Sequence, residues 1–198
     1  MDSESNTCLF ITQFSKAAPG SWSLYASKKI GPEGLLIAVD LLDLDTKTMA
    51  KLKKDETAFH AVKGDFTSKA VQQNILEILA SRTGEPLKID CIISDMAANF
   101  TGDQLTDALR TMNLCEDAMM FAAGSSCFEY GPSFDDRSLL RPGGLFLCKF
   151  FACGQNYEED LMKAASRSFE YTSVIKPTAS RKKSAERYLF ACGFKTDR

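Results

Sequence analysis

The feature that most constrains the fold of this chain is an uninterrupted run of five apolar residues, Leu35–Val39, followed directly by Asp40. Such a run is typical of a strand that is buried on both faces of a parallel sheet. Comparable short apolar runs are Cys8–Phe14, Phe59–Val62 and Ile89–Ile93. The chain is therefore expected to build a sheet from short, buried strands.

Segments with helical spacing separate these strands and follow them. The predicted helices are Trp22–Ile30, Ser68–Arg82, Gln104–Ala123 and Tyr157–Ser168, and the later predicted strands are Leu145–Phe151, Tyr171–Ile175 and Arg187–Cys192. This alternation predicts an α/β fold, with a mostly parallel twisted sheet and helices on both faces. The last two strands follow each other without a helix, so the final strand is expected to run antiparallel. We expect a loop over Gly124–Leu140 and a tight turn at Arg141–Gly144.

The composition agrees with a single domain over residues 1–198. The chain has 44% hydrophobic residues, enough for one core. Its seven cysteines include no C-x-x-C pair and indicate a reduced, intracellular environment. With one histidine, no metal site is expected. The acidic first residues do not resemble a targeting signal, and no apolar run is long enough to cross a membrane.

Acidic residues follow three of the predicted strands. Asp40 is in the position where a carboxylate accepts hydrogen bonds from ribose hydroxyls in doubly wound sheets. Asp65 with Phe66 could hold an adenine, and Asp95 follows the next strand. The alternative is that each aspartate caps the helix that follows it. Because all three are expected at one edge of the sheet, we favour a nucleoside site.

The segment Ala17–Trp22 joins a predicted strand to a predicted helix. Its small residues allow the close approach of a cofactor, and the helix N-terminus that follows is electropositive. The segment is not G-x-G-x-x-G, so it does not indicate the pyrophosphate of a dinucleotide.

Lys149 lies inside the apolar run Leu145–Phe151. A lysine there is costly unless it is paired or functional, and Asp95 and Glu186 are its candidate partners at the ends of neighbouring strands. The alternative is a lysine that protects a sheet edge.

Basic residues gather near the C-terminus although the net charge of the chain is −2. They predict a phosphate-binding surface for RNA, with a solvated loop as the alternative. The predicted RNA-binding residues are Lys176, Arg181, Lys182 and Lys183.

Taken together, these motifs resemble the FtsJ-type (RrmJ-like) family of S-adenosylmethionine-dependent RNA 2′-O-methyltransferases, from Lys16 onward. The matching segments are AAPGSWS from Ala17, DLL from Asp40, GDF from Gly64, SDMAANFTG from Ser94, PGGLFLCK from Pro142, and Lys176–Tyr188, which follows the pattern K-P-x-A-S-R-x-x-S-x-E-x-Y. The last two are specific in both sequence and order. The resemblance implies a Rossmann-like class I methyltransferase fold.

The resemblance also implies residue roles. Lys149 would activate a ribose 2′-hydroxyl, Asp95 would orient its amine, and Glu186 would position the lysine or the ribose. Burial favours the uncharged form of a lysine, whereas Asp95 opposes this. The implied residues for S-adenosyl-L-methionine are Ala18, Pro19, Gly20, Trp22, Asp40, Asp65, Phe66 and Asp95.

The chain departs from the family pattern near its start. The family's first catalytic lysine lies in an R-S-R-A-x-x-K-L segment that is not seen here, and Phe14–Lys16 replaces D-L-G before AAPG. Ala98 replaces a proline. The N-terminus therefore resembles a truncated or divergent one, and we expect cofactor binding with reduced or absent turnover.

Within the family, the motifs are most similar to enzymes that act on uridine in large-subunit ribosomal RNA, including mitochondrial ones. This implies a ribosomal RNA or pre-ribosomal partner, a monomer, no membrane association, and the mitochondrial matrix rather than the nucleus or cytoplasm. The alternatives are methylation of the tRNA anticodon loop and an inactive RNA-binding factor of ribosome assembly.

Overall fold

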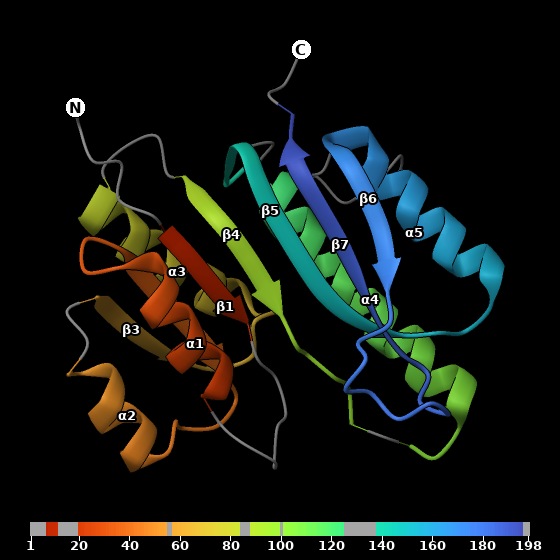
Figure 1. The fold of residues 1–198 in the computed structure, drawn as a ribbon, viewed down its shortest axis with the longest axis horizontal. Coiled ribbons are helices and arrows are strands. Elements are labelled where there is room, and N and C mark those ends of the chain that lie inside the picture. The colour runs from red at the N-terminus through yellow and green to blue at the C-terminus, as the bar shows by residue number, and fades with distance from the viewer. Residues whose placement is uncertain are drawn as a thin grey trace. The chain divides into compact units, whose positions relative to one another are not determined.

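The computed structural model describes residues 7–11, 20–54, 57–83, 88–99, 101–124 and 138–195. The chain forms two compact units, Met1–Ile93 and Ser94–Arg198, each with its own strands and helices (Figure 1). The expectation of a single domain stays a prediction. Ala18 and Pro19 lie outside the described residues, as does most of the predicted loop before Leu140.

The first unit contains parallel strands in the order β3-β2-β1-β4. Its elements are β1 (Thr7–Ile11), α1 (Ser21–Ile30), β2 (Leu35–Asp40), α2 (Thr46–Leu52), β3 (Ala58–Lys63), α3 (Lys69–Thr83) and β4 (Ile89–Ser94). β2 pairs in parallel with both β1 and β3, and all six of its residues are buried. The apolar run Leu35–Val39 therefore lies in β2, which is buried on both faces as predicted.

Helices α1 and α2 pack on β2 through a small apolar cluster. Ala26 of α1 and Leu52 of α2 are buried with Leu36 and Ala38 of β2, and Trp22 packs against them. α2 was not predicted, because seven residues are too few to show apolar periodicity. Its start is nevertheless marked in the sequence: the Asp45 carboxylate accepts hydrogen bonds from the first backbone N–H groups of the helix.

The second unit is antiparallel. It contains α4 (Gln104–Ala123), β5 (Leu140–Phe151), α5 (Gln155–Ser168), β6 (Phe169–Ile175) and β7 (Glu186–Phe194). β7 lies between β5 and β6 and runs antiparallel to both, so the expected antiparallel final strand is confirmed. The buried rings of Phe146, Phe169 and Phe194 form part of the core of this unit.

The predicted turn at Arg141–Gly144 is wrong as a boundary, because β5 already begins at Leu140. Gly143 still has the left-handed backbone of a turn, with φ +78°. Pairing with β7 is seen from Leu145 onward. The Pro-Gly signal therefore marks a bend at the start of the strand rather than the place where the strand begins.

Candidate active site

Lys149 lies near the end of β5 and is 8% exposed. Its neighbours Cys148 and Phe150 point to the opposite face of the strand and are fully buried. Cys148 there contacts Cys115 of α4. A lysine that protects a sheet edge has to reach water, so the low exposure excludes this alternative.

Lys149 forms an ion pair with Asp95. The Nζ atom lies 2.7 Å from Oδ1 of Asp95, and the aspartate side chain is 20% exposed. Asp95 directly follows β4, where the N–H of Met96 donates to the hydroxyl of Ser94 at 3.4 Å. The prediction that Asp95 is a partner of Lys149 is confirmed, and the pair offsets much of the cost of burying the lysine.

Tyr188 links Asp95, which follows β4, to Glu186 on β7. It is opposite Lys149 in the register of β5 and β7, and it is 6% exposed. Its hydroxyl lies 3.0 Å from Asp95 Oδ1 and 3.3 Å from Glu186 Oε1. Burial raises the pKa of Tyr188, and both neighbouring carboxylates add to this effect. The phenol therefore stays protonated and acts as a hydrogen-bond donor.

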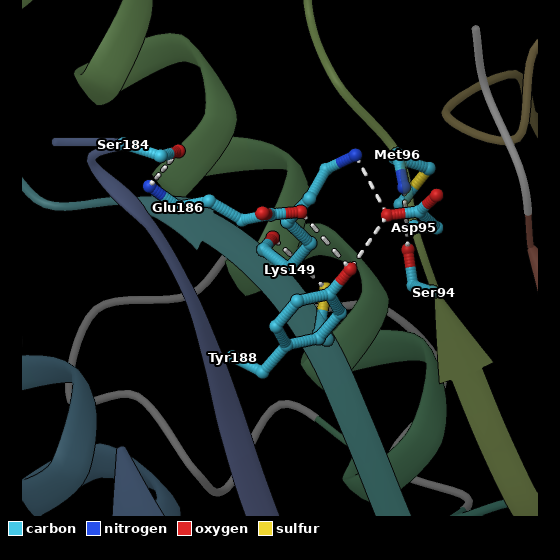
Figure 2. Close-up of polar contacts among 8 residues, drawn as sticks. Ser94, Asp95, Met96, Lys149, Ser184, Glu186 and Tyr188 are labelled. Atoms are coloured by element: carbon cyan, nitrogen blue, oxygen red, sulfur yellow. Dashed lines mark hydrogen bonds and ion pairs between the residues drawn. The ribbon is translucent and has the colours of Figure 1, made fainter. Parts of the chain in front are cut away.

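Glu186 joins the group through Tyr188. Glu186 and Tyr188 are two positions apart on β7, so their side chains lie on the same face of the strand. Glu186 is opposite Phe151 in the register with β5. The Glu186 N–H donates to the Ser184 hydroxyl at 3.1 Å, which fixes the start of the strand. Figure 2 shows Lys149, Asp95, Tyr188 and Glu186 converging from three segments of the second unit. We call these four residues the catalytic cluster.

The loop after Asp95 is tied to the start of α4. The Asp107 carboxylate accepts hydrogen bonds from the N–H of Thr101 at 2.7 Å, from its hydroxyl at 2.8 Å, and from the N–H of Gly102 at 3.2 Å. These bonds lower the pKa of Asp107, the bond from the Thr101 N–H most of all. The loop is thereby anchored on a long helix rather than left to move.

In the first unit, Asp40 is 8% exposed at the end of β2, and its Oδ1 accepts the N–H of Leu42 at 2.9 Å. It lines a pocket of about 130 Å³ together with Ala38, Met49 and Val62, among others. The pocket provides an apolar wall beside a carboxylate. This combination suits one end of a nucleoside.

The other residues predicted to bind the cofactor have structural contacts. Asp65 accepts the N–H and the hydroxyl of Thr67, within the turn that precedes α3, so these bonds do not make it the cap of that helix. Phe66 is 1% exposed and packs in the core. Gly20 precedes α1 with φ +96°, and a Cβ there would come within 2.3 Å of Thr48 Cγ2. Contact of these residues and of Trp22 with a cofactor stays a prediction.

The basic segment divides into two kinds of residue. Lys176 donates from Nζ to the carbonyl oxygens of Lys182 at 2.7 Å and Ser184 at 3.1 Å, and it thereby closes the connection between β6 and β7. Arg181, Lys182 and Lys183 are exposed on that connection. Their cationic groups are therefore better placed than Lys176 to meet phosphates.

The described part of the chain holds neither a cluster of metal ligands nor a membrane-spanning helix. No three His, Cys, Asp or Glu side chains there gather as a metal site would require. The cysteines described are Cys91, Cys115, Cys148, Cys153 and Cys192, all with free thiols. Over these same residues, no helix combines the length and apolar character needed to span a bilayer.

Comparison with protein families gives a match to the FtsJ-like methyltransferase family over residues 16–194. The chain belongs to this family. The match includes all four residues of the catalytic cluster and all the residues that line the pocket of the first unit.

Two relatives of this FtsJ-like chain are both named ribosomal RNA large subunit methyltransferase E. The protein of Rhodopseudomonas palustris (strain BisA53) is 36% identical over 185 residues, which cover 90% of this chain and 64% of that protein. The protein of Pseudomonas fluorescens is 37% identical over 179 residues, covering 90% of this chain and 71% of its own length. The chain thus spans less than two thirds of the Rhodopseudomonas relative.

A solved structure supports the fold. The crystal structure of human methyltransferase-like protein 13 in complex with SAH has a TM-score of 0.53 and 13% identity. The likeness covers 98% of this chain and 74% of the human protein. At this identity the comparison shows the fold alone, which is the expected Rossmann-like methyltransferase fold.

For this FtsJ-like chain, sequence reasoning found three of the four residues in the catalytic cluster. It did not assign a role to Tyr188, although the residue closes the E-x-Y end of the last motif. The available signal was the alternation of side chains along a strand, which puts Tyr188 on the face of Glu186.

Proposed function

We propose that this chain transfers a methyl group from S-adenosyl-L-methionine to a ribose 2′-oxygen of large-subunit ribosomal RNA, at a rate reduced by the departures from the family pattern near Phe14–Lys16. The observation that carries the proposal is the buried ion pair of Lys149 with Asp95, linked through Tyr188 to Glu186. These residues stand on the family's motif positions, and the two relatives above are named for ribosomal RNA methylation.

The first unit has residues that fit the cofactor. The Asp40 carboxylate is suited to accept hydrogen bonds from a ribose diol, and the apolar pocket beside it accommodates part of a nucleoside. Membership of the FtsJ-like methyltransferase family supports S-adenosylmethionine as the cofactor here. When bound, S-adenosylmethionine supplies an electrophilic methyl group on a sulfonium.

The catalytic cluster supplies what the ribose needs. In its neutral form, the Lys149 amine would accept the proton that the 2′-hydroxyl loses when its oxygen takes the methyl group from the sulfonium, which would leave as a neutral thioether. Asp95 orients Lys149 and stabilises the ammonium that results. Tyr188 contacts Asp95 directly, and Glu186 is the second carboxylate within hydrogen-bond distance of the Tyr188 hydroxyl. Much of the rate would come from aligning the two reactants.

The exposed cations Arg181, Lys182 and Lys183 are proposed to contact RNA phosphates near the cluster. Each such contact would make binding weaker as salt is added. The 2′-hydroxyl itself restricts the substrate to RNA.

The deciding experiment measures transfer of labelled methyl groups to unmodified large-subunit ribosomal RNA. Lys149→Met should abolish transfer, because methionine fills the lysine stem but cannot accept a proton. Lys163→Met is the matched control, since Lys163 lies on the exposed surface of α5 and pairs only loosely with Asp160. Transfer retained in Lys149→Met, or no transfer by the folded unaltered chain, would contradict the proposal.

The finer assignments follow from the family resemblance. We propose uridine as the target base, a monomeric protein and the mitochondrial matrix as the compartment. Mapping the methylated nucleotide tests the first, sedimentation the second, and imaging of a C-terminal fluorescent fusion the third. Methylation of tRNA transcripts in preference to ribosomal RNA would favour the anticodon-loop alternative, and tight RNA binding without transfer would favour an assembly factor.

A further inference from the structure

The oxygen Asp95 Oδ1 is shared by two donors. Lys149 Nζ approaches it at 2.7 Å and the Tyr188 hydroxyl at 3.0 Å (Figure 2). A hydrogen bond from a neutral donor withdraws charge from a carboxylate oxygen. The two donors therefore compete for the same negative charge.

The Tyr188 hydroxyl also has two acceptors but only one proton. Glu186 Oε1 lies 3.3 Å away, on the other side of the hydroxyl from Asp95. When the proton points to Asp95, the hold of Asp95 on the Lys149 ammonium weakens. When it points to Glu186, Asp95 is left to hold the ammonium more strongly.

We propose that Tyr188 is a positioning residue whose hydroxyl proton, shared between Asp95 and Glu186, sets how firmly Asp95 retains the proton on Lys149. Among the described residues, Asp95 after β4 and Glu186 on β7 contact this hydroxyl, and Lys149 on β5 contacts Asp95; all three groups are titratable. The thiols of Cys115 and Cys148 lie on the opposite face of β5.

The inference rests on the proposed function for its consequence in catalysis, because a methyl-transfer base must be neutral before it accepts a proton. By competing for Asp95 Oδ1, the Tyr188 hydroxyl weakens the hold of Asp95 on the Lys149 ammonium. Its geometric part concerns this chain's own residues and is tested without cofactor or RNA.

The first test is an NMR titration of lysine side chains labelled with ¹³C at Cε, on the whole chain. Loss of one resonance in Lys149→Met assigns the signal. In Tyr188→Phe the ring stays but the donor is lost, so Lys149 should release its proton at a higher pH, by about one unit or tenfold in proton affinity. A midpoint that is unchanged or lower overturns the inference.

Glu186→Gln provides a second variant that does not depend on the folding of Tyr188→Phe. A weaker acceptor at position 186 directs the hydroxyl proton to Asp95, so Lys149 should release its proton at a lower pH. Removing the negative charge alone would do the same. Combining Glu186→Gln with Tyr188→Phe separates the two causes. The shift in the Lys149 midpoint caused by Glu186→Gln should be at least twofold smaller when the Tyr188 hydroxyl is absent. A shift of equal size in both backgrounds overturns the inference.

The second test measures kcat against pH at saturating RNA and cofactor. The rising limb of the profile should move to higher pH in Tyr188→Phe by the same amount as the NMR midpoint, with KM for RNA within about twofold. A purely structural role would lower kcat at every pH without moving the limb, which overturns the inference. If the unaltered chain transfers no methyl group, the proposed function fails, and the NMR titration still decides the role of Tyr188.

Discussion

The two units of the molecule use aspartates at strand ends in different ways. In the first unit, Asp40 and Asp65 each accept the backbone N–H of the residue two positions later. In the second unit, Asp95 bonds to Tyr188, which is 93 residues away, and to Lys149. The same position after a strand thus serves a local turn in one unit and a long-range cluster in the other.

This difference indicates how the two proposed tasks are divided. A carboxylate that accepts an N–H within its own turn is oriented by that turn. A carboxylate in a cluster of three side chains already has its partners, so its charges are arranged before any substrate arrives. We expect variants of the first kind to change binding and variants of the second kind to change turnover.

The largest expected effect is that of Asp95→Asn. The change leaves Lys149 beside a neutral amide, and we expect kcat to fall by roughly 100- to 1,000-fold, the usual scale for a disturbed acid–base group. The cofactor Kd should change far less than kcat, although the family resemblance also implies a cofactor contact of Asp95. Single-turnover methyl transfer and equilibrium dialysis measure the two quantities. A rise in the cofactor Kd as large as the fall in kcat would contradict the division of cofactor binding and turnover between the two units.

Asp40→Asn should show the reverse pattern. An amide cannot accept hydrogen bonds from a ribose diol as a carboxylate does, and we expect the cofactor Kd to rise about tenfold, near the 1.4 kcal/mol typical of one such bond. At saturating cofactor, kcat should be unchanged. Asp43→Asn is the matched control, because Asp43 lines the same pocket but pairs with Lys63 on the surface. Equal effects of the two variants would argue against a ribose contact at Asp40.

Gly20→Ala tests whether the glycine serves the fold of the first unit. The backbone there has φ +96°, and the added Cβ would meet Thr48 of α2. We expect a loss of about 1–3 kcal/mol in the free energy of unfolding. Gly102 also has a positive φ, but a Cβ added there would meet no other heavy atom within 4 Å. Gly102→Ala should therefore lower the free energy of unfolding by less. Urea denaturation measures both, and an equal cost would assign the effect to backbone strain alone.

The smallest expected effect is on thermal stability, and it concerns the N-cap aspartates of the two units, Asp45 of α2 and Asp103 of α4. Hydrogen bonds from Thr48 lower the pKa of Asp45, and those from Thr106 lower the pKa of Asp103. A carboxyl whose pKa is lower in the folded state stabilises the fold above its unfolded pKa, near 3.9. That contribution disappears as the pH falls through the folded value. Asp45→Ala and Asp103→Ala should therefore lower Tm at pH 6, with a difference from the unaltered chain that shrinks below about pH 4. A constant difference would contradict this origin.

Much of the fold and part of the site could be read from the sequence. Buried parallel strands produce apolar runs that no other element imitates easily, so Leu35–Val39 identified β2 correctly. Lys149 stood out because a charge in an apolar strand requires a partner, and Asp95 is that partner. Both arguments depend on local composition, which is fully present in the sequence.

Other features depend on distances that the sequence does not contain. Tyr188 belongs to the cluster because of the register between β5 and β7, and register cannot be read from either strand alone. The contact of Lys176 with carbonyl oxygens depends on the path of a loop. The burial of Phe66 follows from how the first unit packs, and it cannot be read from the GDF segment alone.

The position of β7 between β5 and β6 has a consequence for how activity is lost. Two of the four residues of the catalytic cluster, Glu186 and Tyr188, belong to β7. This last strand has to insert between β5 and β6, which both precede it in the chain. A partly folded form without β7 would keep the first unit with its pocket but have no cluster. On slow heating, methyl transfer should therefore disappear before cofactor binding does, and recovery of activity after refolding should report the insertion of this one strand.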